Sequence, residues 1–582
     1  MEVFMTAFRN MTVYLILLAV IAVSGIFLTE IKPNKVKRII YVSAVFLSLI
    51  LLSAFRYGIG NDYFSYINVF QMINEINTPH PTMGEISYEP LFTLLTRFIG
   101  LFTQNTEVYT AIYSICALVP AGLAVYLYSK RPMVSCFTYV CFAFFYMTMN
   151  FTRQAIAVSI ILLGWKFLRD RKLIPAMLII IAAAGFHYSA LLMVPIYFLS
   201  ALKPRPLLIG IEAAAAAAAF IFSDKLIVLA AKLLGGKYED YISSSFILEG
   251  LSPVYVILPV LIFAAVYGTY LVKDKHDGTD TEDNVFANLM FYQAVIWIFM
   301  TKHSIMERLS YYPFVFSVLA LPAAAQYIES LISDRKGLDE INRKMSETEE
   351  LTVEWLDLMR SSVKQKHKMR RGKAAYSLLV IAICGVSLWY NSYIGSAGLF
   401  GAHGVFPYQT NILSVREKGM EMLSPIQRDR MLSAVDSTID FLLLAADDDY
   451  TVVVSTKGEY TRFLDNTFLR AYRLRGFEGS FPEHRTGTAV IAVSEVCGEP
   501  ALYERYSGGE FSAQFNMDYG KIEITSSSRK NGKSSIMVCG KEYSSNEEGI
   551  NIAVIRTETG EVVDAVNIAS NINPHIKSHL TE

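Results

Sequence analysis

Long apolar segments recur through the first two thirds of the chain and limit what it can fold into more than any other feature. Each is close to the roughly 20 residues that a helix needs to cross a bilayer. The segments are 11–29, 38–55, 108–128, 133–150, 155–168, 173–186, 188–202, 206–223, 253–272, 284–301, 309–328 and 374–393. Only 18% of all residues are charged, whereas soluble proteins carry roughly 25%. We therefore predict an α-helical polytopic membrane protein with about 12 spans.

The last apolar segment is followed by a region of ordinary soluble composition. Its β-branched runs are typical of strands, and helix-like stretches lie between them. This alternation predicts a compact α/β domain. The predicted strands are 450–455, 488–493, 521–526, 535–538 and 550–556, and the predicted helices are 429–446 and 458–472.

The uneven distribution of charge predicts four regions. They are a membrane core (1–333), a cytoplasmic charged helical insert (334–373), a last transmembrane helix (374–395) and the α/β domain (396–582). Apolar residues recur in the insert mostly at three- and four-residue spacing, which predicts an amphipathic helical hairpin. The formal net charge is −1, which argues against a nucleic-acid partner.

Short basic loops predict the orientation in the membrane. Lysines and arginines near 32–38, 130–131, 169–172 and 203–205 mark cytoplasmic loops. These loops fall on one side only if a shorter stretch, 91–102, enters the membrane and returns without crossing. We therefore expect one re-entrant segment and an extracytoplasmic α/β domain, where Cys497 and Cys539 could pair. A further amphipathic stretch, 226–234, is expected to lie on the outer membrane surface.

Unusual polar residues gather at the predicted outer ends of the spans. A charge at the bilayer centre costs about 2.5–3.5 kcal/mol, so such groups need an interface, a partner or a wet cavity. Other interpretations stay open: Asp62 suits a helix cap, Glu89 a helix N-terminus, and His187 a hydrogen-bonded interface. Their gathering at one face favours a polar, outward-facing cavity. The set is Arg56, Asp62, Glu89, Arg153, Gln154, His187, His303, Glu307 and Arg308.

Five short segments around these residues resemble the EpsG family of membrane polysaccharide polymerases, relatives of the broader Wzy group. The resemblance covers roughly residues 50–330, while the insert and the long tail depart from the plainest family members. The segments are RYGIGNDYFSY (56–66), YEPLF (88–92), FTRQAIAVSI (151–160), GFHYSALLMVPIYFL (185–199) and RLSYY (308–312).

The resemblance implies transfer of a growing glycan from polyprenyl diphosphate to the next lipid-linked repeat unit, outside the cytoplasm. A guanidinium group binds phosphate oxygens in a bidentate manner, which suits Arg56, Arg153 and Arg308. The acceptor hydroxyl must lose a proton. The candidate bases, in order of preference, are Asp62, Glu89 and His187, and the candidate substrate contacts are Tyr63 and Gln154.

The implied partners are the polyprenyl-diphosphate-linked oligosaccharide, its glycan, membrane lipid and other polysaccharide-assembly proteins. No cofactor and no metal are expected, although Asp62 and Glu89 could hold Mg²⁺ with the diphosphate. Two alternatives remain open. One is a ligase that moves finished glycan to another acceptor, and the other is a transporter or flippase for lipid-linked sugars.

The tail carries a second resemblance. The stretch NGKSSIMVCGKEYSSNEEGINIAVIRTETGEVVDAVNI (531–568) resembles the interleukin-like EMT-inducer domain, and residues 434–506 could supply its other half in permuted order. This resemblance implies a domain that binds glycan or docks a partner.

Overall fold

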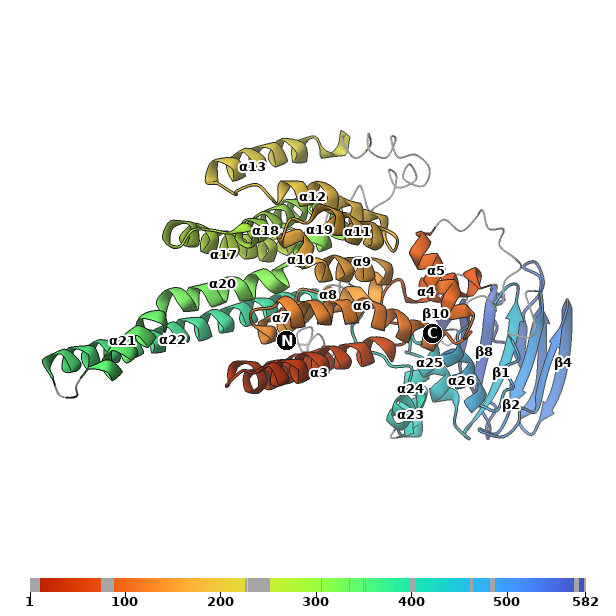
Figure 1. Ribbon diagram of the computed structural model, residues 1–582. Coiled ribbons are helices and arrows are strands. Elements are labelled where there is room, and N and C mark those ends of the chain that lie inside the picture. The colour runs from red at the N-terminus through yellow and green to blue at the C-terminus, as the bar shows by residue number, and fades with distance from the viewer. Residues whose placement is uncertain are drawn as a thin grey trace. The chain divides into compact units, whose positions relative to one another are not determined.

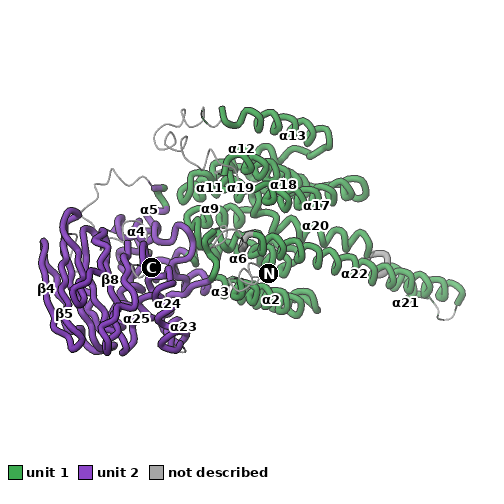
Figure 2. Tube along the Cα trace, turned by 180° about the vertical axis from the view of Figure 1, so that it is seen from behind, with its two compact units in different colours: residues 1–50, 89–91, 114–407 green, residues 51–88, 92–113, 408–582 purple. Residues whose placement is uncertain are grey.

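The chain folds into two compact units. The structure is a computed structural model. Unit 1 comprises residues 1–50, 89–91 and 114–407, and unit 2 comprises 51–88, 92–113 and 408–582 (Figure 2). The amphipathic stretch expected at 226–234 lies outside the described residues, apart from residue 228. The described residues are 11–74, 88–225, 228, 252–304, 306–333, 335–348, 350, 352–396, 403–421, 423–460, 464–481, 487–569 and 575–579.

Unit 1 is helical throughout its described elements (Figure 1). Residues 51–54 of α3 and 106–113 of α6 belong to unit 2. In chain order the elements are α2 (Thr12–Gly25), the π-helix η1 (Ile26–Glu30), α3 (Lys35–Ala54), α6 (Thr106–Tyr128), α7 (Pro132–Cys141), α8 (Phe144–Asn150), α9 (Thr152–Leu163), α10 (Trp165–Arg169), α11 (Leu173–Ala184), the 3₁₀ helix η2 (Tyr188–Leu192), α12 (Met193–Leu199), α13 (Pro206–Ile221), α17 (Val254–His276), α18 (Thr281–Met300), α19 (Met306–Phe314), α20 (Ser317–Ile332), α21 (Arg335–Glu347) and α22 (Val353–Ser396).

Several of these helices are long and apolar enough to cross a bilayer. Among the described residues there are 5, or up to 7 if each of two bent pairs counts as one span. The pair α7–α8 bends by 47° next to Ala143, whose φ is +67°. The pair α19–α20 bends by 41° after Pro313, which lacks the N–H that a helix needs. The protein is thus a multi-pass membrane protein, and the number of 12 spans stays a prediction.

Two antiparallel helices occupy the charged insert. The hydroxyl of Ser362 in α22 donates to Oδ1 of Asn342 in α21 at 3.2 Å. Helix α22 is continuous over 44 residues, so the predicted boundary at residue 373 has no break in the backbone. Because an α-helix forms its backbone hydrogen bonds within its own segment, a charged half and an apolar half can share one helix.

Unit 2 combines short helices with ten strands (Figure 1). Its elements are α4 (Tyr63–Ile73), α5 (Pro90–Gly100), α23 (Leu413–Glu421), α24 (Pro425–Leu432), α25 (Thr438–Ala445), β1 (Tyr450–Lys457), α26 (Asn466–Leu474), β2 (Ala489–Ser494), β3 (Tyr503–Ser507), β4 (Glu510–Met517), β5 (Gly520–Ser527), β6 (Ser535–Val538), β7 (Lys541–Glu542), β8 (Gly549–Arg556), β9 (Val562–Ala569) and β10 (His575–His579). The predicted helix 429–446 is divided, because Ser437 caps a new helix by accepting the backbone N–H of Asp440.

Strand β1 is the centre of the sheet. It pairs antiparallel with β8 along its whole length and with β2 on its other edge. On one side of β1, β8 pairs with β9 and β9 pairs with β10. On the other side, β2 pairs with β3. Lys457 of β1 also pairs with Ser527 of β5. Strand β5 pairs with β4 and with β6, and β6 pairs with β7. The sheet therefore branches at this point into two layers.

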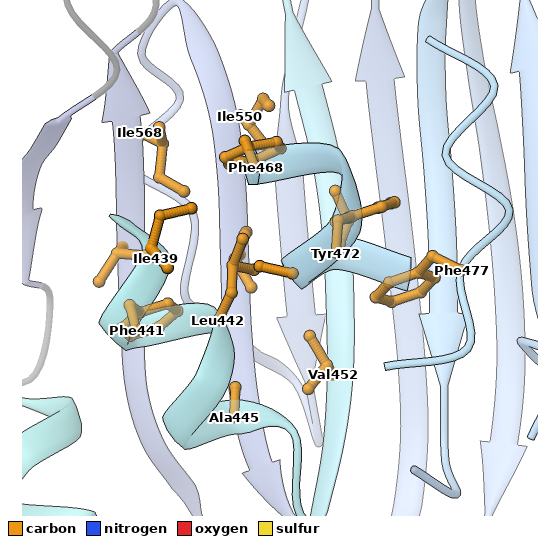
Figure 3. Packing of buried hydrophobic residues seen from close by; sticks show 14 of the residues in the cluster. Ile439, Phe441, Leu442, Ala445, Val452, Phe468, Tyr472, Phe477, Ile550 and Ile568 are labelled. Atoms are coloured by element: carbon orange, nitrogen blue, oxygen red, sulfur yellow. The ribbon is translucent and has the colours of Figure 1, made fainter. Parts of the chain in front are cut away.

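Each face of β1 packs against a different layer, because successive side chains of a strand point to opposite faces. Val452 and Val454 contact a cluster formed with the short helices, including Phe468 of α26 (Figure 3). Val453 faces the second cluster, which includes Ile524 of β5. The C-terminal region is thus a three-layer arrangement of helices, sheet and sheet.

Cys497 and Cys539 are separate thiols, so the suggested pairing is not made. Cys497 Sγ lies 3.5 Å from the carbonyl of Leu474, and Cys539 Sγ lies 3.4 Å from that of Tyr519. The two residues sit after different strands of the two sheet layers, which a single sequence does not reveal.

The turn at residues 56–62 is part of unit 2 and is held by backbone hydrogen bonds. The N–H of Tyr57 donates to the carbonyl of Gln409 at 3.0 Å, and the N–H of Asn411 donates to that of Phe55 at 2.9 Å. Gly58 and Gly60 have φ values of +64° and +95°, which glycine adopts most readily. The glycines therefore allow the chain to turn tightly beside residues 409–411.

Aromatic residues of this turn belong to the helix-side core of unit 2. Tyr57, Tyr63 and Ile67 are buried in the same cluster as Phe468. The rings of Tyr57 and Tyr63 meet edge to face at 5.9 Å. The predicted substrate contact Tyr63 is 3% exposed, so packing alone accounts for its position here.

A buried carboxyl makes the stability of unit 2 depend on pH. Asp465 is 2% exposed and caps α26 by accepting the N–H of Phe468 at 2.8 Å. Burial raises the pKa of Asp465 to about 7. Because this exceeds the pKa of about 3.9 in the unfolded chain, the stabilisation is complete below pH 4 and is lost as the pH rises through 7.

We therefore expect the free energy of unfolding of unit 2 to fall by about 2.5 kcal/mol between pH 5 and pH 8. Asp465→Asn keeps a capping oxygen and removes this part of the dependence. Pulse proteolysis of the purified full chain in urea, scored on fragments of 408–582, measures the free energy of unfolding of the wild type and of the Asp465→Asn variant at each pH. Parallel pH curves for the two proteins would contradict the expectation.

Candidate functional site

A buried ion pair joins two of the predicted site residues. Arg153 lies in the first turn of α9, and Glu89 directly precedes Pro90, the first residue of α5. The Arg153 guanidinium donates to Glu89 Oε2, and the backbone N–H of Tyr188 lies 3.4 Å from Glu89 Oε1. The side chain of Glu89 is 7% exposed. A charge buried this deeply needs a partner, and Arg153 supplies it.

A second polar chain starts at His187, where the backbone leaves α11. His187 Nδ1 lies 2.6 Å from the hydroxyl of Ser189, which lies 2.9 Å from the hydroxyl of Tyr312 in α19. The extended backbone of His187 separates α11 from η2. Irregular backbone within a membrane is tolerated where it is buried in protein or lines a cavity. The break therefore presents the imidazole at the junction of three helices.

Gln154, the residue after Arg153 in α9, contacts Arg308 of α19. The side-chain amide of Gln154 donates to the carbonyl of Arg308, which orients the Gln154 carboxamide. Its Oε1 is buried and accepts no hydrogen bond from the described residues. The guanidinium carbon of Arg308 lies 4.9 Å from the ring centroid of Phe151. The arrangement leaves one buried acceptor at Gln154, whose amide contacts the backbone of Arg308.

His403 joins this cluster without any local signal in the sequence. It follows the last long helix, and its Nε2 lies 3.1 Å from the hydroxyl of Tyr311, which also donates to Glu307 Oε1 at 3.0 Å. Its Nδ1 lies 3.4 Å from the amide nitrogen of Asn150. Tyr311 lies within the RLSYY segment, which could have drawn attention to it. His403 is 92 residues away, and no motif marks it.

The structure thus gathers five predicted residues within unit 1. Their elements are the N-terminal turns of α9 and α19, the break before η2, and the residue before α5. Polar groups from these elements form hydrogen bonds with one another. The five residues are Glu89, Arg153, Gln154, His187 and Arg308.

The other three predicted residues belong to unit 2. Arg56 is buried, donates to Ser53 and lies with its guanidinium carbon 5.5 Å from the ring centroid of Tyr63. Asp62 occupies the N-cap position of α4, but its side chain makes no capping hydrogen bond. The capping interpretation of Asp62 is therefore not supported. The substrate roles of these three residues stay predictions.

The unit 1 cluster is suited to an anionic substrate. An anion with two or more oxygens can replace the Glu89 carboxylate on Arg153, because guanidinium binds both in the same bidentate manner. The exchange would free the Glu89 carboxyl group from Arg153, so that it could take part in proton transfer. Gln154 Oε1 and the His187–Ser189–Tyr312 chain add acceptors and donors for hydroxyl groups.

Comparison with known families identifies the membrane region. The model of the EpsG family matches residues 39–336, just over half of the 582 residues. Comparisons with curated proteins and with solved structures give no significant match. The matched range contains all eight predicted site residues, while the resemblance of 531–568 to the EMT-inducer domain lies outside it and stays a prediction. The chain belongs to the EpsG family.

Proposed function

We propose that the protein polymerises polyprenyl-diphosphate-linked oligosaccharide repeat units at the outer face of the cytoplasmic membrane. The product would be exopolysaccharide, capsule or O-antigen, and the activity that of a glycosyltransferase. Membership of the EpsG family is consistent with a polysaccharide polymerase. The observation that carries the proposal is the buried Arg153–Glu89 pair, with Arg308 on the neighbouring helix.

The pair supports a substitution mechanism at the anomeric carbon. The diphosphate of the donor takes the place of Glu89 on Arg153, and Arg308 adds a second cation. The acceptor hydroxyl oxygen then attacks the anomeric carbon while the bond from that carbon to the diphosphate oxygen breaks. The hydroxyl proton passes to Glu89, and the arginines stabilise the charge on the departing polyprenyl diphosphate. Attack opposite the leaving group inverts the anomeric carbon.

Glu89 replaces Asp62 as the preferred base in this proposal. Glu89 contacts Arg153, the cation that would bind the leaving group. Binding of the donor diphosphate to Arg153 would therefore release Glu89 from this ion pair. Asp62 remains the alternative. The soluble α/β region, which we place outside the cytoplasm, would hold the glycan or dock other assembly proteins.

Reconstitution of the purified full chain tests the proposal. Lipid-linked repeats isolated from cells that lack this protein are added to liposomes, and products are separated on a gel. A ladder of lengths that grows with time is expected. Repeats that cross the bilayer without growing would indicate a flippase, and single-step transfer to an acceptor other than a repeat would indicate a ligase.

Ser189 provides a milder test of the hydroxyl-binding chain. Ser189→Ala removes the group between His187 and Tyr312. A net hydrogen bond contributes about 0.5–1.5 kcal/mol, so we expect the KM for the acceptor repeat to rise by up to about tenfold. Ser310→Ala is the matched control, because its hydroxyl donates only to a carbonyl of its own helix, 2.6 Å away. Equal kinetics of the two variants would contradict the assignment.

A further inference from the structure

An apolar groove runs between α13, α17 and α18 in unit 1. Its volume is about 440 Å³, and its lining contains only apolar side chains. Helix α13 contributes small residues, including Ala213 and Ala217, and the other helices contribute rings, including Phe263 and Phe291. Figure 1 shows α13 running beside this pair of helices. Alanines on α13 leave open the space that larger side chains would fill.

Polar contacts lie at the two ends of the groove. At one end the hydroxyl of Tyr292 donates to Glu212 Oε1 at 3.3 Å. At the other, Lys302 Nζ lies 2.6 Å from Asp224 Oδ2 and 5.8 Å from the ring centroid of Phe220. The lining of α13 from 213 to 221 corresponds to roughly 12 Å of helix. The groove is therefore one apolar channel with a cation at one mouth.

The cationic mouth is close in the sequence to one member of the cluster around Arg153. Lys302 follows the end of α18, and Arg308 lies in the first turns of α19, which packs against α18. Asp224 is 67% exposed, so an anionic headgroup can readily take its place on Lys302. One channel with one cationic mouth matches a lipid that has one chain and one anionic headgroup. An ordinary phospholipid carries two chains.

We propose that this groove binds the isoprenoid chain of the polyprenyl diphosphate carrier, on the side nearest the diphosphate. The inference rests on the proposed function, because that function supplies the carrier. Flat, unsaturated isoprene units fit between aromatic rings and small alanines. Each buried CH₂ contributes about 0.8 kcal/mol, so a few carbons in the groove give a large gain in affinity.

Binding of undecaprenyl phosphate to the full chain in nanodiscs, followed by native mass spectrometry, tests the groove. Ala217→Trp fills it, and Ala215→Trp is the matched control on the opposite face of α13. We expect Ala217→Trp to weaken binding about tenfold or more, and Ala215→Trp to change it less than about twofold. Ala213→Trp, a second filling variant, should behave like Ala217→Trp. Equal melting temperatures of all variants verify folding.

Three outcomes separate this inference from the proposed function. Equal binding by the two α13 variants would overturn the groove, whatever the polymerisation assay gives. Displacement of undecaprenyl phosphate by an equal concentration of phosphatidylglycerol would also overturn it, because the groove would then hold ordinary lipid. Weak binding by Ala217→Trp together with a wild type that elongates no repeats would support the groove as a prenyl-lipid site and reject the polymerase.

Discussion

Replacing Arg153 with alanine is expected to reduce polymer formation by about a hundred- to a thousandfold. The substitution removes the cation that, in our proposal, binds the diphosphate and holds Glu89 until the donor arrives. Lipid-linked single repeats should accumulate while long chains disappear. A gel of lipid-linked and surface glycans, at matched membrane protein levels, measures this result.

The same substitution also leaves the Glu89 carboxylate buried without its arginine, which destabilises a protein by about 3–5 kcal/mol. A double variant, Glu89→Gln with Arg153→Ala, removes the orphaned charge. We expect it to restore the protein level but not the polymer. Arg205→Ala, at an exposed position before α13, is the control. A normal ladder from the double variant would reject both residues as participants in the reaction.

Tyr63→Ala is expected to destabilise unit 2 by about 3–5 kcal/mol, the usual range for truncating a buried aromatic ring. Tyr63 is 3% exposed and packs against the rings of Tyr57 and Phe64. The loss would expose the region to protease at lower urea concentration. Pulse proteolysis, scored on fragments of 408–582, gives the change in free energy.

Tyr63→Leu separates packing from substrate contact. Leucine fills much of the same space, so we expect a loss of only about 1–2 kcal/mol and normal polymer per folded molecule. If the ring contacts the substrate, as predicted from the sequence, Tyr63→Leu would instead lose activity while unit 2 stays folded. The two substitutions together therefore decide which role Tyr63 has.

Several strands of unit 2 could be predicted because their sequences are locally distinctive. The β-branched runs at 450–455, 488–493, 521–526, 535–538 and 550–556 fall within β1, β2, β5, β6 and β8, with differences of one or two residues at the ends. Strands β3, β4, β7, β9 and β10 were not predicted. Of these, β4 has alternating exposure along its length and contains no β-branched residue. Its two-residue period is the signal that composition alone overlooks.

Local motifs also predicted part of the site. They identified Arg153, His187 and Arg308 as polar residues at helix ends, where a membrane protein rarely places them without a reason. They did not reveal that Arg153 pairs with Glu89, 64 residues earlier. His403 was missed entirely, because nothing within its own neighbourhood distinguishes it from an ordinary loop histidine.

The sequence by itself determined that the chain crosses a membrane as helices and ends in an α/β region. Apolar runs must satisfy their backbone hydrogen bonds internally, and the helix does this segment by segment. Only the tertiary structure decided that the turn at 56–62 packs into the core of unit 2, and that Glu89 contacts Arg153 and the backbone of Tyr188 in unit 1. These arrangements depend on contacts between distant segments, which local periodicity does not encode.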